Sequence, residues 1–511
     1  MTSSRTPWIL GGLAVGLTGL ATSHAVALVL GVRQSPVVAV AEAIVRILPG
    51  NVAERGIRAL GHLDKPFLLG CIIVGVTATF AVAGLLARRH LWAGQLVFVV
   101  LGVVGGLAAV VPKDFTGSQL VPVLVGLATW LVALPWVSAV LSRPDPPVEA
   151  VTEAVGPSRR GFLVRVGALG LVSAGFLLAG RWLSHGRRAV EQARELLHLD
   201  GVTKPAVPRT ARIGLRGVTP WMTESADFYQ VHTAIAIPAI DPADWSLRLH
   251  GMVDRELVLS FQDLLDRQLT EAWITLNCVS NAVGGDLIGN AWWSGVRVKD
   301  LLVEAGVHDG ADAVLQTSSD GWTCGTPLAA LLDARNALLA VAMNGEPLPL
   351  EHGFPVRTIV PGLYGYVSAC KWVVDLEVTR FDTISAYWTS RGWAEEAPVK
   401  ISSRIDVPKD GARVASGPLR VGGVAWAQFT GIEDVEVSLD GGAWQSAEVG
   451  YVPTNDTWVQ WAVLVYVEPG DHQLRVRAVD KTRSVQTGVE QDVLPDGATG
   501  WHSVDFTAED A

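Results

Sequence analysis

The chain has 511 residues, of which 49% are hydrophobic and 18% are charged, and its formal net charge is −10 at pH 7. This length allows several domains, but the chain is too apolar to be a simple soluble enzyme. The excess of apolar residues lies in the first third of the chain. With a net negative charge, the chain is not expected to bind nucleic acid.

Five apolar stretches in the first third are each about 19 to 22 residues long, enough to cross a bilayer core as a helix. They are Ile9–Leu30, Phe67–Ala87, Leu91–Val111, Leu120–Leu141 and Phe162–Gly180. Buried core helices are the alternative, but helices without a polar face do not suit a soluble domain of this size. We therefore predict an N-terminal α-helical membrane domain with about five spans.

Basic residues suggest an orientation for these spans. Arg88–Arg89 lie between the second and third stretches, and Arg143 and Arg159–Arg160 lie between the fourth and fifth. Because cytoplasmic loops carry the excess of Lys and Arg, everything after Gly180 is predicted to be extracytoplasmic. Arg187–Arg188, which follow the fifth stretch, oppose this assignment.

A second signal precedes the fifth stretch. Ser158–Leu163 reads SRRGFL and is followed by a Gly- and Ala-rich segment, which looks like a twin-arginine export motif. Adjacent arginines before a span are also an ordinary topology signal. No cleavage site is evident after Gly180, so the helix is expected to remain as an anchor. These signals predict a multi-pass protein of the cell membrane with its C-terminal part outside.

A charged, amphipathic neck (Trp182–Leu199) and a Gly/Pro/Arg-rich connector (Asp200–Thr219) lead to the next region. Hydrophobic patterning there predicts short strands and short helices, which is typical of an α+β domain. The strands are Trp245–His250, Trp273–Leu276 and Ala313–Gln316, and the helices are Phe261–Leu269, Val298–Ala305 and Pro327–Leu332.

The most informative stretch, Trp273–Asp300, ends a strand-like run on Cys278 inside a loop of Asn, Ser and Gly. Thiolate is a sulfur ligand that a high-valent transition metal accepts, and small neighbouring residues let a bulky cofactor approach the backbone. A buried structural cysteine is the alternative.

Several motifs then follow in order: N-C-x-S-N-x-x-G-G around Cys278, W-x-G-V-x-x-x-D-L-L ending at Leu302, and MNGEPLPLEHGFPVRTIVPGLYGYVSACKWV over Met343–Val373. From Asp227 to Thr379 the chain resembles the sulfite oxidase family of molybdopterin enzymes. The resemblance implies a mixed-sheet fold that wraps a molybdenum-molybdopterin cofactor, with Cys278 as the molybdenum ligand.

The same resemblance implies a set of cofactor-binding residues. They are Tyr229, Gln230, Cys278, Thr317, Ser318, His352, Arg357, Ser368 and Lys371. Arg357 offers a planar fork and Lys371 a point charge for a phosphate, although either could form a surface salt bridge instead. His352 is equally read as a satisfied core histidine, and Thr317 and Ser318 as surface turn residues.

Two departures from the family concern the substrate. Trp322 stands where sulfite oxidases carry a catalytic tyrosine, and an indole cannot act as a phenolic acid. His232 stands where they carry an arginine. Asp320 could supply acid/base catalysis or simply cap a turn. Cys278, His232, Trp322 and Asp320 are therefore the candidate catalytic residues, and sulfite is not assigned as the substrate.

From about Ile401 the pattern changes to alternating β formers, with a hairpin signal at Asp440–Gly442. Such spacing predicts a β-sandwich. The expected strands are Ala412–Val414, Pro418–Ala425, Val435–Leu439, Trp458–Tyr466 and His472–Val479. The resemblance implies an immunoglobulin-like domain, which in relatives often forms a homodimer contact.

The predicted domains are 1–157 (four spans), 158–199 (export motif, fifth span and neck), 200–400 (catalytic) and 401–511 (sandwich). The implied activity is oxygen-atom transfer on a small extracytoplasmic substrate. Reduction of a sulfoxide-like compound is slightly favoured over sulfite oxidation. A membrane-anchored binding or adhesion module with a degenerate molybdopterin fold is the alternative.

The electron partner is not identified by any motif. The chain lacks C-x-x-C-H for covalent haem and G-x-G-x-x-G for a dinucleotide, so electrons must pass through another partner, such as a quinone or cytochrome. His24, His62 and His90 could ligate haem in the membrane domain. They fall at different depths, so packing or interfacial roles are the simpler interpretation.

Overall fold

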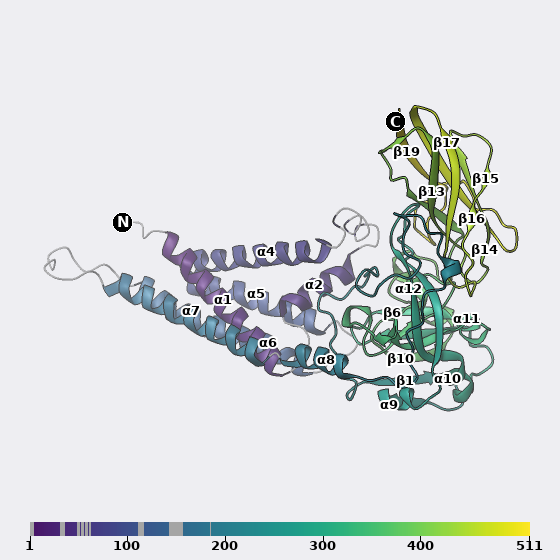
Figure 1. Cartoon of the computed structure of the whole chain (residues 1–511). Helices are drawn as coiled ribbons and strands as arrows, with labels where there is room; N and C mark the ends of the chain where they lie inside the picture. The colour runs from purple at the N-terminus through teal and green to yellow at the C-terminus, as the bar shows by residue number, and fades with distance from the viewer. Residues whose placement is uncertain are drawn as a thin grey trace. The chain divides into compact units, whose positions relative to one another are not determined.

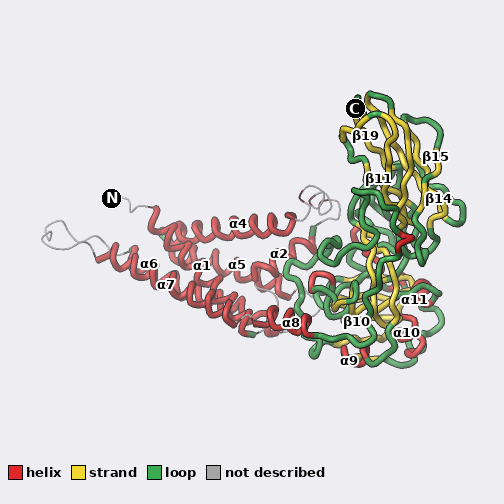
Figure 2. Tube along the Cα trace, in the orientation of Figure 1, coloured by secondary structure: helices red, strands yellow, loops and turns green. Residues whose placement is uncertain are grey.

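The computed structural model describes residues 5–30, 36–48, 52, 56, 60, 63–110, 117–142, 157–183 and 185–510. The chain forms two compact units: Met1–Glu191 with Thr233–Pro238, and Gln192–His232 with Ala239–Ala511. The first is helical and the second is rich in β-strands (Figures 1 and 2). We call them the helical unit and the β-rich unit and describe each by itself.

The helical unit is built mainly from long apolar helices, with one short amphipathic helix, α2, among them. They are α1 (Arg5–Val29), α2 (Pro36–Ile47), α4 (Asp64–Ala87), α5 (Leu91–Val110), α6 (Leu120–Leu141) and α7 (Pro157–Leu183), followed by α8 (His185–Leu196), which leads into the β-rich unit. The short α2 was not expected from the sequence. It is amphipathic and carries Glu42, so its pattern differs from that of a span.

Helix α1 packs closely against two neighbours through its glycines. A Cβ on Gly16 would lie 2.1 Å from the Phe80 ring of α4, and one on Gly12 would lie 2.8 Å from the Gly84 backbone. The Trp130 indole N–H of α6 donates to the Gly16 carbonyl over 2.9 Å. Only glycine permits these close backbone approaches, so α1 forms the centre of the unit.

Among the described residues, four helices are long and apolar enough to cross a membrane: α1, α4, α5 and the segment Gly117–Leu141 that contains α6. They overlap the first four predicted spans. The predicted fifth span falls in α7, whose apolar part Gly161–Phe176 is shorter than these four among the described residues. The count of five spans therefore stays a prediction.

The candidate haem histidines are not brought together. Because Gly12 meets Gly84 while Gly16 meets Phe80, α1 and α4 run antiparallel. His24 near the end of α1 and His90 after the end of α4 consequently lie at opposite ends of the unit. His62 lies outside the described residues.

The first part of the β-rich unit contains two sheets of five strands. One has the order β2-β1-β10-β5-β6; the other has the order β3-β4-β7-β8, with β9 also paired to β7. The strands are β1 (Ser246–Gly251), β2 (Leu257–Ser260), β3 (Thr270–Asn277), β4 (Ile288–Arg297), β5 (Ala313–Ser318), β6 (Thr323–Pro327), β7 (Leu338–Met343), β8 (Glu346–Pro347), β9 (Arg357–Ile359) and β10 (Val373–Thr379).

Short helices connect these strands and cover a shared apolar core. They are α9 (Phe261–Leu265), α10 (Val298–Ala305), α11 (Leu328–Leu332) and α12 (Gly365–Ser368). Helix α9 begins with a capping box between Ser260 and Asp263 but ends four residues before the predicted Leu269, because β3 already begins at Thr270. The mixture of β-rich sheets and short helices agrees with the predicted class.

The second part of the β-rich unit is a two-sheet sandwich (Figure 1, green to yellow). Side chains such as Trp461 and Val476 from opposite sheets share one buried core. The sheet orders are β11-β13-β17-β16 and β12-β19-β18-β14-β15. The strands are β11 (Ser402–Val407), β12 (Ala412–Ala415), β13 (Gly417–Trp426), β14 (Ile432–Leu439), β15 (Gln445–Ser446), β16 (Glu448–Val449), β17 (Val459–Val467), β18 (Gly470–Asp480) and β19 (His502–Glu509).

Candidate functional site

Cys278 lies at the stem of the loop that joins β3 to β4. Its backbone N–H donates to the Leu287 carbonyl over 2.9 Å, and its carbonyl accepts from the Asn281 N–H over 3.1 Å. The Asn281 side-chain oxygen accepts from the Leu287 N–H over 2.9 Å, which closes the loop internally. Residues Cys278–Leu287, which we call the cysteine loop, therefore hold a half-buried thiol in a defined place.

Tyr229 and Arg357 lie in the electrostatic neighbourhood of this thiol. Burial raises the pKa of Tyr229 well above its usual value, the Cys278 thiolate raises it further, and the Arg357 guanidinium opposes both. The Tyr229 phenol consequently stays protonated and can donate a hydrogen bond. Three residues predicted from separate motifs are thus brought together.

Arg357 on β9 is a buried cation. It is 2% exposed, its Nη1 donates to the His352 carbonyl over 3.1 Å, and its guanidinium lies over the Trp293 ring at 5.3 Å. Burial lowers the pKa of Arg357 to about 10. Since no carboxylate in the described part of the chain forms an ion pair with it, the geometry favours an anionic ligand over the salt-bridge alternative.

His352 presents an unsatisfied acceptor. Its Nε2 lies 3.0 Å from the Ser225 carbonyl and must donate to it, which leaves Nδ1 as an acceptor. That atom is buried and has no hydrogen-bond partner. Burial, with the nearby Lys371 and Arg357 charges, lowers the pKa of His352 to about 3, so the ring is neutral at physiological pH. A bound group with an N–H or O–H donor would satisfy Nδ1, as the polar edge of a pterin can.

Lys371 and Ser368 both donate hydrogen bonds to backbone carbonyls. Lys371 is mostly buried, and its Nζ donates to the Glu351 carbonyl over 2.8 Å. The Ser368 hydroxyl is directed to the Leu363 and Tyr364 carbonyls at 3.2 and 2.9 Å, where it ties down α12. Its geometry supports a structural role more than cofactor contact.

The residues between β5 and β6 form a tight turn. The Ser318 N–H donates to the Trp322 carbonyl over 2.9 Å, and the Trp322 N–H donates to the Asp320 carboxylate over 3.0 Å. Asp320 therefore caps the turn, the simpler of its two interpretations. Trp322 packs against the main core of the first part, while Thr317 is half-buried at the end of β5.

His232 and Gln230 have different surroundings. The His232 ring meets Trp372 edge-on at 5.9 Å, beside Lys371. Gln230 is exposed and borders a cavity of about 390 Å³ that also reaches His352. Its lining is polar and of mixed charge: Arg194, Lys204, Glu224, Ser225, Ala226, Gln230, Asn344, Glu346, Pro347, Pro349, Glu351 and His352.

A buried polar network behind the site was not predicted. The Gln316 amide donates to the Thr326 hydroxyl over 2.6 Å and accepts from the Thr358 hydroxyl over 2.6 Å. Thr358 in turn accepts from the Cys370 N–H over 2.8 Å, next to Lys371. The one available signal was the presence of polar residues inside otherwise apolar strands.

Comparison with known proteins gives the family. Residues 234–388 match the oxidoreductase molybdopterin binding domain. The chain is 35% identical over 176 residues to the uncharacterized oxidoreductase YuiH of Bacillus subtilis (strain 168), covering 34% of this chain and 85% of that protein. It is 29% identical over 303 residues to the mitochondrial sulfite oxidase of Rattus norvegicus, covering 49% of this chain and 55% of that protein.

A more distant relative is the nitrate reductase [NAD(P)H] of Hordeum vulgare, 27% identical over 349 residues, with 56% of this chain and 38% of that protein covered. The chain thus spans about half the length of the rat sulfite oxidase and less of the nitrate reductase. The described residues fit a molybdenum-molybdopterin group: Cys278 offers a thiol in a defined loop, Arg357 a buried cation without an ion pair, and His352 Nδ1 an unsatisfied acceptor. The chain is a molybdenum-dependent oxidoreductase and belongs to the sulfite oxidase family.

Proposed function

We propose that the protein transfers an oxygen atom to or from a small neutral or zwitterionic substrate, with reduction of a sulfoxide-like compound favoured over oxidation of sulfite. The observation that carries this proposal is Trp322. Its indole packs against the core and has no phenolic proton, and the half-buried His232 replaces a permanent cation. A site without that phenol and that positive charge should bind the doubly charged sulfite ion less well.

The residues around the cofactor have separate tasks in this proposal. Cys278 would ligate molybdenum, which, when bound, supplies two-electron oxygen-atom transfer. Arg357 and Lys371 would bind the anionic end of the pterin. His352 would accept a hydrogen bond at Nδ1, and Tyr229 would donate one, because burial and the thiolate keep its phenol protonated.

The relatives leave the direction of the reaction open, because one carries the name of an oxidase and another that of a reductase. A substrate panel decides it. We expect turnover of sulfoxides with an artificial electron donor, and sulfite oxidation with an artificial acceptor on the order of a hundredfold slower than in a true sulfite oxidase. Rapid sulfite turnover would contradict the proposal.

A matched variant sharpens this test. Trp322→Tyr restores a phenol at the position, and we expect it to raise sulfite oxidation relative to sulfoxide reduction. Trp388→Tyr, which changes another half-buried tryptophan against the same core, should leave that ratio unchanged.

We further propose that the helical unit anchors the enzyme in the cell membrane with the β-rich unit outside, fed by a membrane quinone or a cytochrome. In the described part of the chain, four helices of sufficient length and apolar character support the anchor, and the basic residues between the apolar stretches support the orientation. An immunoglobulin-like topology for the sandwich, and pairing of two copies through it, rest on resemblance alone. The mass of the detergent-solubilised protein tests the pairing.

A further inference from the structure

The sandwich reaches the cysteine loop through one buried arginine. Arg404 on β11 is 7% exposed, and its Nη1 donates to the Gly285 carbonyl of the cysteine loop over 2.6 Å. Its Nη2 donates to the Thr219 hydroxyl over 2.7 Å, and its Nε to the Asp406 carboxylate over 2.8 Å. Each of the three guanidinium nitrogens therefore donates a hydrogen bond, which defines the orientation of the group.

Asp406 completes this arrangement. It is 2% exposed, and its second carboxylate oxygen accepts from the Thr219 N–H over 2.9 Å. A buried ion pair is tolerated only when hydrogen bonds satisfy its remaining groups, as they do here. The Arg404–Asp406 pair thus links the connector that precedes the catalytic domain, the sandwich and the cysteine loop.

A histidine of the sandwich holds the neighbouring loop residue. The Nδ1 of His502 on β19 accepts from the Ile405 N–H over 3.0 Å, so its proton is on Nε2. The ring lies against Gly284, where a Cβ would come within 2.2 Å of His502 Cδ2 and where φ is +76°. Only glycine suits both this contact and this backbone conformation.

Contacts inside the cysteine loop connect Gly284 and Gly285, which the sandwich holds, to Cys278. The Gly285 N–H donates to the Ala282 carbonyl over 2.9 Å, and a Cβ on Gly285 would lie 2.5 Å from the Asn281 side-chain oxygen. Asn281 accepts from Leu287, whose carbonyl accepts from the Cys278 N–H. A displacement at Gly285 is therefore passed to the residue that would bind the metal.

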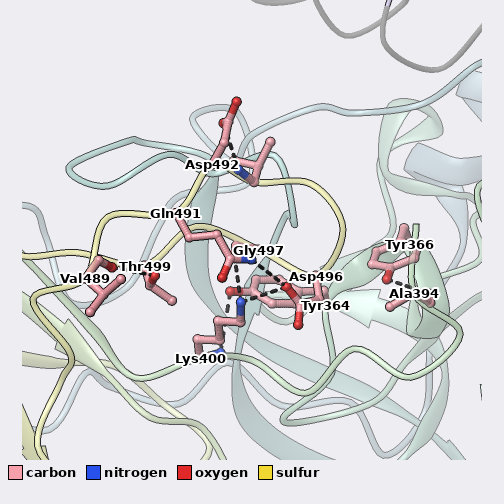
Figure 3. A network of polar contacts seen from close by, with 11 residues as sticks. Tyr364, Tyr366, Ala394, Lys400, Val489, Gln491, Asp492, Asp496, Gly497 and Thr499 are labelled. Carbon is pink, nitrogen blue, oxygen red and sulfur yellow. Dashed lines mark hydrogen bonds and ion pairs between the residues drawn. The ribbon is translucent and has the colours of Figure 1, made fainter. Parts of the chain in front are cut away.

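A second contact between the sandwich and the catalytic part limits relative movement. Figure 3 shows Lys400, whose Nζ contacts the Asp496 carboxylate and the Gly497 carbonyl, both at 2.8 Å. The Lys400 N–H donates to the Tyr364 hydroxyl over 3.4 Å, and Tyr364 precedes α12. The sandwich therefore contacts the catalytic part near the site at two places, through Arg404 and through Asp496.

We propose that Arg404 and His502 are positioning residues for Cys278, so that the C-terminal sandwich determines where the metal ligand lies. The proposal rests on the proposed role of Cys278 as molybdenum ligand. It assigns to the sandwich a part in catalysis that is independent of any subunit pairing.

The test uses the full chain in detergent and the variant Arg404→Met, which keeps the length of the side chain but removes the fork. The control is Arg413→Met, because Arg413 is an exposed arginine of the same sandwich, 78% exposed at its side chain and paired with Glu509. Hydrogen exchange of the cysteine loop is measured in protein prepared without molybdenum. We expect exchange there to rise about tenfold in Arg404→Met and not in the control.

Enzyme loaded with molybdenum supplies the second readout. In Arg404→Met we expect kcat to fall by on the order of a hundredfold with little change in KM, since misplacing a reacting group by about 1 Å has such an effect. The thiolate-to-metal absorption should shift as well. Unchanged loop exchange in Arg404→Met would overturn the proposal.

In Arg404→Met the buried Asp406 carboxylate loses its ion-pair partner, and the sandwich could unfold for that reason alone. The double variant Arg404→Met/Asp406→Asn removes both charges and is therefore measured in parallel. If both variants unfold, His502→Ala serves, because it removes the ring that lies against Gly284 while the cysteine loop and the ion pair keep their residues. Raised exchange in the cysteine loop supports the proposal, and unchanged exchange rejects it. If wild-type protein binds no molybdenum while loop exchange still depends on Arg404, the proposed function fails and the positioning contact stands.

Discussion

Trp221 and Trp458 each donate their indole N–H to the other's backbone carbonyl, over 3.0 and 2.7 Å. The two residues are 237 positions apart, and they belong to a buried aromatic cluster that includes Trp273 and Trp426. This reciprocal pair joins the segment before the catalytic strands to the sandwich, so the two parts of the β-rich unit should unfold together.

The pair can be tested by Trp221→Phe. The change leaves the buried Trp458 carbonyl without its donor, and we expect the free energy of unfolding of the β-rich unit to fall by about 1–3 kcal/mol. Trp444→Phe, at a half-buried tryptophan of the sandwich, is the control. Denaturant unfolding followed by separate probes in the catalytic part and in the sandwich checks both variants, and an unaltered midpoint for Trp221→Phe would contradict the expectation.

Cys278→Ser should remove activity and the thiolate-to-metal absorption while the protein stays folded. A hydroxyl is a harder ligand than the thiolate it replaces. We expect a loss of activity on the order of a hundredfold or more. Cys71→Ser is the matched control, because Cys71 is an exposed cysteine of the helical unit. Full activity in Cys278→Ser would show that Cys278 is not the molybdenum ligand.

His352 should make the β-rich unit sensitive to acid. Its folded pKa is lowered to about 3, whereas a histidine in an unfolded chain titrates near 6.5. Between these values the unfolded chain binds a proton that the folded protein does not, so stability falls as the pH falls. From pH 6.5 to 5 the loss attributable to His352 should be about 2 kcal/mol.

The measurement compares denaturation midpoints of wild type and His352→Asn, both prepared without cofactor, across this pH range. The asparagine keeps a hydrogen-bonding side chain but does not titrate. We therefore expect a shallower pH dependence in the variant. Identical slopes would show that His352 gains a proton in the folded state.

Replacing Arg159 and Arg160 by Lys should leave the β-rich unit in the cytoplasm if the motif is read as an export signal. The substitution keeps the charge but removes the guanidinium groups. Arg187→Lys with Arg188→Lys is the control, because these adjacent arginines lie on the other side of the apolar part of α7. Protease accessibility in wall-stripped cells is the readout, and equal accessibility in all three proteins would reduce the pair to a topology signal.

Local signals predicted much of this fold. Length and composition identified the segments of α1, α4, α5 and α6, and a pattern of Asn, Ser and Gly identified the Cys278 loop. Helix α2 was missed because a short amphipathic segment is not a membrane span. Strand β11 was missed because it has no marked alternation of its own and is defined by pairing with β13. Strand β19 was missed although Val504, Phe506 and Ala508 alternate with polar residues along it.

The support of the candidate site was harder to predict. Arg404 acts on a carbonyl 119 residues away, and Gln316 joins two hydroxyls whose strands meet only in the folded protein. No local spacing encodes such contacts. The family motifs named the candidate cofactor-binding residues, whereas the hydrogen bonds that hold them required the structure.

The place of β19 has a consequence for the order of events during synthesis. This strand, His502–Glu509, lies between β12 and β18 and pairs with both, so the sheet stays open until those residues have been made. Its first residue also holds Gly284. Although domains fold largely from the N-terminus, the cysteine loop is completed only after the sandwich closes. The contact between His502 and Gly284 therefore forms only once the last strand of the sandwich has paired, so the cysteine loop is among the last parts of the β-rich unit to gain all its contacts.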